Sequence, residues 1–116
     1  MKKIIVRFRT INRDTWSAIR RGTKSVETRA ATVKYRNIMA GDVLVFVCGK
    51  DRFEKKIKRV RHFKSIAGLF RAIPMQKVLP KAMSIAGAQK IYFSFPGYKE
   101  KIRKSGLIAL ELETPS

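Results

Sequence analysis

The segment DVLVFVCG, from Asp42 to Gly49, carries apolar side chains on both faces of the strand that its composition predicts. Three valines at alternate positions would project to one face, and Leu44, Phe46 and Cys48 would project to the other. A sheet with one face in water would not tolerate such a strand. The segment therefore predicts either a central strand or a barrel strand that is covered on its outside by a helix.

The residues before this strand predict two further strands and a helix. In KKIIVRFRTI, from Lys2 to Ile11, apolar and basic side chains alternate, which indicates a strand with one buried and one basic face. NRDTWSAIRRG predicts a short helix that Asn12 or Asp14 can cap and that Gly22 ends. KSVETRA, from Lys24 to Ala30, predicts the second strand.

The residues after the strand begin with a strongly basic segment, KDRFEKKIKRVRHFK, from Lys50 to Lys64. We predict a hairpin here, with a bulge or bend between Ile57 and Val60 because these two apolar positions differ in parity. KSIAGLFRAI, AMSIAGAQKIYF and PGYKEKIRKSG predict three short helices. LIALELE, from Leu107 to Glu113, predicts a closing strand with alternate apolar residues inward and its glutamates outward.

These segments amount to about five strands and three or four short helices. The strands are not separated by regular crossover helices, which disfavours a doubly wound sheet. We expect an α+β fold, a small mixed β-barrel with the helices packed against its outside. The 116 residues suit a single domain over residues 1–116, and 45% hydrophobic residues supply a core.

The charge balance is extreme, with 27 Lys and Arg against 8 Asp and Glu and a formal net charge of +19. Because this excess opposes compaction, it indicates a polyanionic partner, with nucleic acid first and an anionic membrane surface second. The basic segment 50–64 is not amphipathic at helical spacing, which argues against a membrane-surface helix. The sequence has no stretch that could span a bilayer and no signal-peptide core. We expect a cytoplasmic monomer without a membrane partner.

The cysteine and histidine content argues against a disulfide or a metal site. Cys48 is the only cysteine, so no internal disulfide can form, as suits a reducing compartment. Cys48 and His62 cannot supply the three or four ligands of a zinc site, and no carboxylate shows ligand spacing. We expect neither a metal nor a cofactor.

The segment GTKSVETRAAT, from Gly22 to Thr32, places one of the few carboxylates, Glu27, between Lys24 and Arg29. Lys24 reaches Glu27 only if it lies in the turn after Gly22, before the strand begins. Glu27 would then hold both cations in fixed rotamers, and such a pair beside an opening makes an anion site. The alternative is an exposed ion pair between Glu27 and Arg29 that contributes little.

With these segments in view, the chain resembles the ASCH domain, a branch of the PUA-like fold. IRRGTKSVETR is similar to the family's G-x-K-x-x-E-x-R signature, and MAGDVLVF is similar to its Gly-Asp turn and following strand. The likeness continues through VRHFKSIAGLF and YFSFPGYKEKIRKSGLIALELE and covers nearly the whole chain. It implies a small β-barrel with flanking helices and a role linked to RNA. Some members resemble amidohydrolases that deacylate a modified cytidine, and ribonuclease activity has been attributed to others.

In the amidohydrolase branch the signature Lys is paired with a Thr three positions later, and here these positions hold Lys24 and Glu27. Thr28 follows, but it would point to the other face of the strand. No acid stands between Glu54 and Glu100 as a counterpart of that branch's further catalytic Glu. These departures argue against nucleophilic threonine chemistry.

Three functions stay open, and the first is an RNA-binding PUA-like module for single-stranded or structured RNA. The second is a hydrolase acting on RNA or a modified nucleoside, as a ribonuclease or an N4-acylcytidine amidohydrolase, with Lys24 and Glu27 as its catalytic residues. The third is an accessory of a larger ribonucleoprotein. The sequence leaves open whether any bond is cleaved.

The RNA-contacting residues follow from charge and from one turn rich in aromatic residues. Tyr98, after Pro96 and Gly97, is expected to face outward and to stack on an unpaired base, with Ser94 exposed at the same turn. Since few acids neutralise the basic segment, we expect it to contact phosphates. The expected nucleic-acid-binding residues are Arg9, Arg20, Arg21, Lys24, Arg29, Lys55, Lys56, Lys58 and Tyr98.

Overall fold

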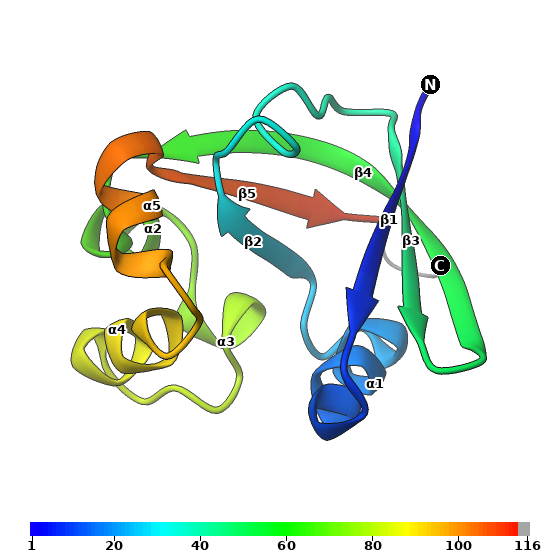
Figure 1. Ribbon diagram of the computed structural model, residues 1–116, viewed down its shortest axis with the longest axis horizontal. Coiled ribbons are helices and arrows are strands. Elements are labelled where there is room, and N and C mark those ends of the chain that lie inside the picture. The colour runs from blue at the N-terminus through cyan, green and yellow to red at the C-terminus, as the bar shows by residue number, and fades with distance from the viewer. Residues whose placement is uncertain (114–116) are drawn as a thin grey trace.

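The computed structural model describes residues 1–113 (Figure 1). Its strands are β1 (Lys3–Phe8), β2 (Val26–Ala30), β3 (Val43–Cys48), β4 (Asp51–Phe63) and β5 (Leu107–Leu112). Its helices are the short 3-10 helix η1 (Thr10–Asn12), α1 (Arg13–Arg21), α2 (Ile66–Ala72), α3 (Met75–Val78), α4 (Ile85–Phe93) and α5 (Tyr98–Ser105). The α+β class and the five strands confirm the prediction. The additional helix is α3, a single turn between Pro74 and Pro80 that the sequence did not indicate.

The five strands form one mixed sheet in the order β1-β3-β4-β5-β2. β1 pairs with β3 in parallel, and the other ladders are antiparallel. β4 is long enough to pair with both neighbours, because residues 51–56 pair with β3 and residues 57–63 pair with β5. Its register shifts between Ile57 and Arg59, which confirms the predicted irregularity at the point where the strand changes partner.

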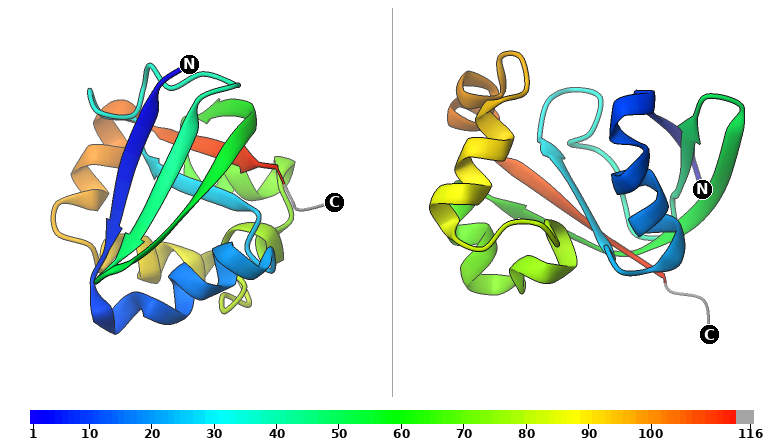
Figure 2. Two further views of the ribbon diagram at one scale, coloured as in Figure 1. Left: turned by 90° about the vertical axis from the view of Figure 1, so that its right-hand side faces the viewer. Right: turned by 90° about the horizontal axis from the view of Figure 1, so that it is seen from below.

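The sheet curls strongly, and Figure 2 shows that its two ends turn toward each other. β1 and β2 are the edges, and within residues 1–113 no ladder joins them. The sheet is therefore a curled half-barrel, which is consistent with the small barrel that the sequence predicts. The cleft described below lies between these edges.

Two hydrophobic cores lie on opposite faces of the sheet. The first packs α1, through Trp16 and Ile19, against Phe46 of β3 and its neighbours. The second packs α2 to α5 against β2 and β5, with Leu69 and Ile102 among its members. β3 is a central strand between β1 and β4, as its apolar faces predict.

Two details of the predicted elements are wrong. β5 was expected to have only one apolar face, but Leu107 and Ala109 are buried in the second core because helices cover that face. Asn12 occupies the N-cap position of α1 without making a side-chain cap, and the Asp14 carboxylate instead accepts from the Thr15 amide. The other end agrees, since Gly22 ends α1 in the left-handed region with φ of 88°.

The basic segment is one long strand rather than a hairpin. The turn precedes it, at Gly49 and Lys50, and β4 then continues unbroken to Phe63. The hairpin prediction was wrong because β4 pairs with β3 along one edge and with β5 along the other, a tertiary arrangement that local pattern does not encode.

None of the helices in the described part of the chain combines the length and the apolar character that crossing a bilayer requires.

Candidate functional site

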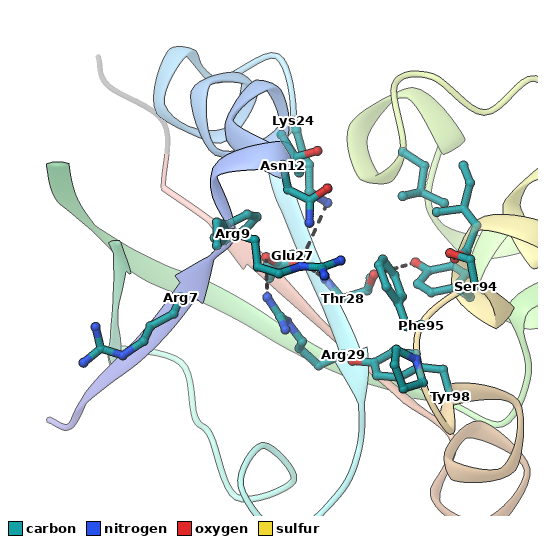
Figure 3. Close-up of a pocket in the computed structure, with 16 residues that line it drawn as sticks. Arg7, Arg9, Asn12, Lys24, Glu27, Thr28, Arg29, Ser94, Phe95 and Tyr98 are labelled. Atoms are coloured by element: carbon teal, nitrogen blue, oxygen red, sulfur yellow. Dashed lines mark hydrogen bonds and ion pairs between the residues drawn. The ribbon is translucent and has the colours of Figure 1, made fainter. Parts of the chain in front are cut away.

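A cleft of about 640 Å³ lies between the two edges of the half-barrel, and we call it the main cleft. On one side it is lined by the end of β1, and on the other by β2 together with the segment from α4 to α5. Four cationic side chains line it, and a single carboxylate stands among them (Figure 3). They are Arg7, Arg9, Lys24, Arg29 and Glu27.

Lys24 lies in the turn after Gly22, as the sequence predicts, and its side chain is 3% exposed. Its Nζ donates to the carbonyl oxygens of Val26, at 2.7 Å, and Val78, at 2.5 Å. Burial lowers the pKa of Lys24, while the Glu27 carboxylate opposes this effect and the Arg29 guanidinium adds to it. The ammonium therefore joins the turn before β2 to the end of α3.

Glu27 is buried between two cations, with its Oε1 3.9 Å from Lys24 Nζ and its Oε2 3.5 Å from Arg29 Nη2. Oε1 also accepts from the Thr28 amide at 2.9 Å, whereas Oε2 has no hydrogen-bond partner within residues 1–113. The exposed surface ion pair that the sequence left open is therefore wrong, because only 7% of the Glu27 side chain is exposed.

The Arg29 guanidinium is held in place by aromatic rings as well as by charge. It lies 5.9 Å from the centre of the Phe8 ring and 5.6 Å from that of Tyr35, which are distances typical of cation–π contacts. Burial is the largest single effect and acts against its charge, but the Glu27 carboxylate, Tyr35 and Tyr98 together outweigh burial, so the pKa of Arg29 is raised. Its Nε has no hydrogen-bond partner in the part of the chain that the structure describes.

Thr28 points to the other face of β2, as expected, yet it also lines the main cleft because β2 is an edge strand. Its hydroxyl lies 2.5 Å from the hydroxyl of Tyr92, a residue of α4 that is 2% exposed. Burial raises the pKa of the Tyr92 phenol, and the hydrogen bond with Thr28 offsets part of this effect. The two hydroxyls tie β2 to the helical side of the cleft.

The aromatic rim of the cleft differs from the prediction for Tyr98. Tyr98 is half-buried, and its hydroxyl accepts from the Ala30 amide at 3.5 Å, so it does not face outward. Phe95 packs against it edge-on and is the more exposed ring at 39%. Ser94 lines the same end of the cleft, as Figure 3 shows. Phe95 is therefore the exposed ring of the cleft, and Phe93, two residues earlier, is exposed but does not line the cleft.

Among the predicted nucleic-acid-binding residues, the structure brings Arg9, Lys24, Arg29 and Tyr98 together around the main cleft. Arg20 and Arg21 do not line it. The cleft is lined by the first turn of α1, and at 1.5 Å per residue these arginines lie about 10 Å further along the helix. Arg20 instead lies over the Trp16 ring, 5.7 Å from its centre.

The three lysines predicted from the basic segment do not form one surface. Lys55 points inward with Phe53 and Ile57, and its Nζ donates to the Ile19 carbonyl at the end of α1. Burial lowers the pKa of Lys55. Lys56 and Lys58 are exposed, and neither lines the main cleft. Lys55 lies apart from the other two because a continuous strand sends neighbouring side chains to opposite faces, and contact of these lysines with RNA stays a prediction.

Several residues of the cleft wall escaped the sequence analysis. They are Arg7, Phe8, Asn12, Thr15, Leu79, Ile91 and Phe95. For Arg7 a signal was available, since it shares a strand face with Arg9. The sequence carried no such signal for Asn12, Thr15 and Leu79, because their positions in the cleft wall depend on how α1 and α3 pack. Within residues 1–113, no group of three or more His, Cys, Asp or Glu side chains is placed to hold a metal ion.

Two solved structures are similar to this chain along nearly its whole length. The crystal structure of hypothetical protein PH0355 is 29% identical in sequence, with a TM-score of 0.83 over 97% of this chain and 98% of that one. The solution NMR structure of protein PF0455 from Pyrococcus furiosus is 27% identical, with a TM-score of 0.76 over 96% of each chain. No family model matches the sequence, and neither does any curated protein. The chain therefore shares its fold with two solved structures over nearly its whole length.

Proposed function

We propose that the protein binds single-stranded RNA in the main cleft, as a PUA-like module of the ASCH type. The motif that carries the ASCH resemblance, GTKSVETR, supplies three of the five charged side chains of this cleft. The curled half-barrel with α2 to α5 packed on one face is consistent with the fold that this resemblance implies.

The observation that carries the proposal is the buried Glu27 between Lys24 and Arg29. A carboxylate in that position fixes two cations against the wall of an open cleft, so they need little reorganisation when an anion arrives. Arg7 and Arg9 are exposed at the same cleft and add long-range attraction for phosphate. The net charge of +19 favours a polymeric anion over a small neutral substrate.

The aromatic rim supports an unpaired strand rather than a duplex. Phe95 lines the cleft and is 39% exposed, and Phe93 is 40% exposed with the Lys99 ammonium 5.7 Å from the centre of its ring. Exposed rings beside cations stack on unpaired bases, whereas the bases of a helix are already stacked on one another. The rim and the cationic floor therefore suit a base and its phosphate respectively.

Hydrolysis of RNA or of an acylated nucleoside is the second candidate, and the lowered pKa of Lys24 is the observation that favours it. Two contacts oppose a catalytic Lys24, because the carbonyl oxygens of Val26 and Val78 hold its Nζ in place. Glu27 stands where the related amidohydrolases have a threonine, and the Thr28 hydroxyl is engaged by Tyr92. We therefore place binding first.

A titration of short labelled RNA at several salt concentrations tests the proposal. Each phosphate neutralised on a single strand adds about −0.7 to the slope of log K against log salt, so a contact with roughly four to six phosphates gives a slope of about −3 to −4. Arg9→Ala should weaken binding and flatten the slope by about 0.7. Arg52→Ala is the matched control, since it removes the same charge from an exposed residue outside the cleft.

Two results would contradict the proposal. One is the absence of affinity for any RNA at low salt. The other is an equal loss of affinity in Arg9→Ala and Arg52→Ala, which would assign binding to overall charge rather than to the cleft. Release of acyl groups or cleavage of RNA by the purified protein, abolished by Lys24→Ala, would favour the second candidate instead.

A further inference from the structure

A second cavity of about 370 Å³ adjoins the main cleft, and we call it the side cavity. It lies between α1 and the segment that runs from α3 into α4. Its walls are mostly aliphatic, and the side chains concerned are Ile11, Ala18, Val78, Leu79, Pro80 and Ile91. Ile11 is 80% exposed whereas Val78 is fully buried, so this apolar wall is open to solvent at Ile11. At the rim, Asp14 forms an ion pair with Lys81.

The two cavities share one wall, because Asn12, Thr15, Lys24, Leu79 and Ile91 line both. Figure 3 shows Asn12 and Lys24 at the same end of the main cleft. The side chains of Asn12 and Thr15 make no hydrogen bond with another residue in 1–113. The Lys24 ammonium lines both cavities, with carbonyl oxygens accepting two of its three N–H donors and Glu27 Oε1 3.9 Å away. Where the cavities meet, the polar groups without a partner in residues 1–113 are therefore those of Asn12 and Thr15.

We propose that the side cavity receives the nucleoside that follows the one in the main cleft, so that the protein holds two consecutive nucleosides with their linking phosphate at Asn12, Thr15 and Lys24. This inference rests on the proposed function and adds to it a defined two-nucleoside site. An amide, a hydroxyl and an ammonium are suitable donors for a phosphodiester, which accepts hydrogen bonds and carries one negative charge.

The chemistry of the side cavity fits an unpaired base. Aliphatic walls on opposite sides, from α1 and from residues 78–80, can cover both faces of a flat ring. Its volume lies within the range of about 300–1,000 Å³ that is usual for small-ligand sites. The one carboxylate at the rim, Asp14, is neutralised by Lys81 and accepts from the Thr15 amide, so it offers little repulsion to the phosphate.

Competition against a labelled RNA measures this site directly. The competitors are the four nucleoside 5′-monophosphates and the four dinucleoside monophosphates with two identical bases. A dinucleoside monophosphate carries less charge than a mononucleotide, so tighter binding cannot come from charge alone. Burying one additional base should improve affinity about tenfold in the wild type.

Ala18→Leu fills the side cavity without touching the main cleft, because Ala18 lines only the former. It should remove the tenfold advantage of the dinucleotide and leave mononucleotide affinity unchanged. Ser17→Leu is the matched control, since Ser17 lies on the same helix and lines neither cavity. It should change neither affinity.

Thr15→Val gives a second test that does not depend on filling the cavity. It should weaken a charged dinucleotide about tenfold and weaken the analogue with an uncharged methylphosphonate linkage less, because that linkage keeps an accepting oxygen but not the charge that strengthens the hydrogen bond. The inference is overturned if the wild type binds dinucleotides no more tightly than mononucleotides. It is also overturned if Ala18→Leu and Thr15→Val both leave dinucleotide affinity intact. In either case binding of longer RNA would still support the main cleft, whereas failure of every RNA would end the proposed function itself.

Discussion

The Lys24 ammonium donates to the Val78 carbonyl oxygen across 2.5 Å and so connects two segments that lie 54 residues apart in sequence. One segment is the turn before the edge strand β2, and the other is the end of the single-turn helix α3. Val78 itself is fully buried in the second core. The position of Lys24 in the cleft is therefore fixed by the helical side of the protein as well as by Glu27.

Replacing Lys24 by methionine should destabilise the protein by about 3 kcal/mol. The side chain keeps its length, but the carbonyl oxygens of Val26 and Val78 lose their donor and the Glu27 carboxylate loses a cation. Urea unfolding followed by circular dichroism measures the change. Lys56→Met, at an exposed position of β4, is the control and should change stability by less than about 0.5 kcal/mol. Equal stability of the two variants would show that Lys24 does not anchor α3.

Glu27→Gln should weaken RNA binding about tenfold, even though it removes a negative charge from a cleft that attracts anions. Arg29 would lose the partner that holds its guanidinium 3.5 Å from the carboxylate, and the cations of the cleft would no longer be prearranged. Glu54→Gln removes the same charge from an exposed residue of β4 and should strengthen binding slightly. If both variants strengthen binding alike, Glu27 does not organise the cleft.

The hydroxyl pair of Thr28 and Tyr92 should contribute measurable coupling to stability. Tyr92→Phe leaves the buried Thr28 hydroxyl without its partner, and Thr28→Val leaves the buried Tyr92 hydroxyl without its partner. Each variant should lower the free energy of unfolding by about 1–2 kcal/mol. The double variant should cost less than the sum of the two, by at least about 0.5 kcal/mol, because it removes both polar groups together. A double-mutant cycle from urea unfolding supplies these values, and strictly additive effects would contradict the contact.

The sequence was informative wherever one residue's neighbours along the chain decide its environment. The alternation of Ile4, Val6 and Phe8 identified β1, and the two apolar faces of residues 43–48 identified a central strand. Gly22 correctly predicted where α1 ends. Because α1 ends there, Lys24 lies in a turn and can reach Glu27.

The sequence was uninformative where environment comes from distant segments. The alternation along the strand places Lys55 on the same face as Phe53 and Ile57. A lysine is ordinarily exposed, however, and the acceptor for its ammonium is the Ile19 carbonyl at the end of α1, which the local sequence does not indicate. The shared wall of the two cavities depends on packing between α1 and α3, and α3 itself is too short to produce a periodic signal.

Asp42 should make stability depend on pH in the acid range. Backbone N–H groups of Lys2 and Met39 donate to its buried carboxylate at 2.9 Å, and these bonds hold the pKa of Asp42 below its ordinary value. Since the folded pKa is depressed, this stabilisation is present above the unfolded pKa of about 3.9 and is lost as pH falls through the folded value. Urea unfolding between about pH 2 and 6 should show a weaker pH dependence for Asp42→Asn than for the wild type. Parallel curves would contradict the assignment.

Gly106, between α5 and β5, should be among the least replaceable residues of the fold. Its backbone has φ of 74° and ψ of −163°, a conformation essentially restricted to glycine, and an added Cβ would collide with the carbonyl oxygen of Phe63. Because the obstacle is backbone of β4, relief requires a shift of a central strand. Gly106→Ala should therefore cost about 3 kcal/mol or more.

Gly49→Ala is a comparison that separates the two costs of Gly106→Ala, which are the Cβ collision with Phe63 and the positive φ. Gly49 also has a positive φ, of 61°, but a Cβ there meets nothing within 4 Å, so the cost should be only about 1 kcal/mol. Thermal and urea unfolding of both variants give the comparison, with the wild type as reference. Equal losses would mean that Phe63 moves aside freely and that the junction of α5 with β5 is not the rigid link that positions the helical wall of the cleft.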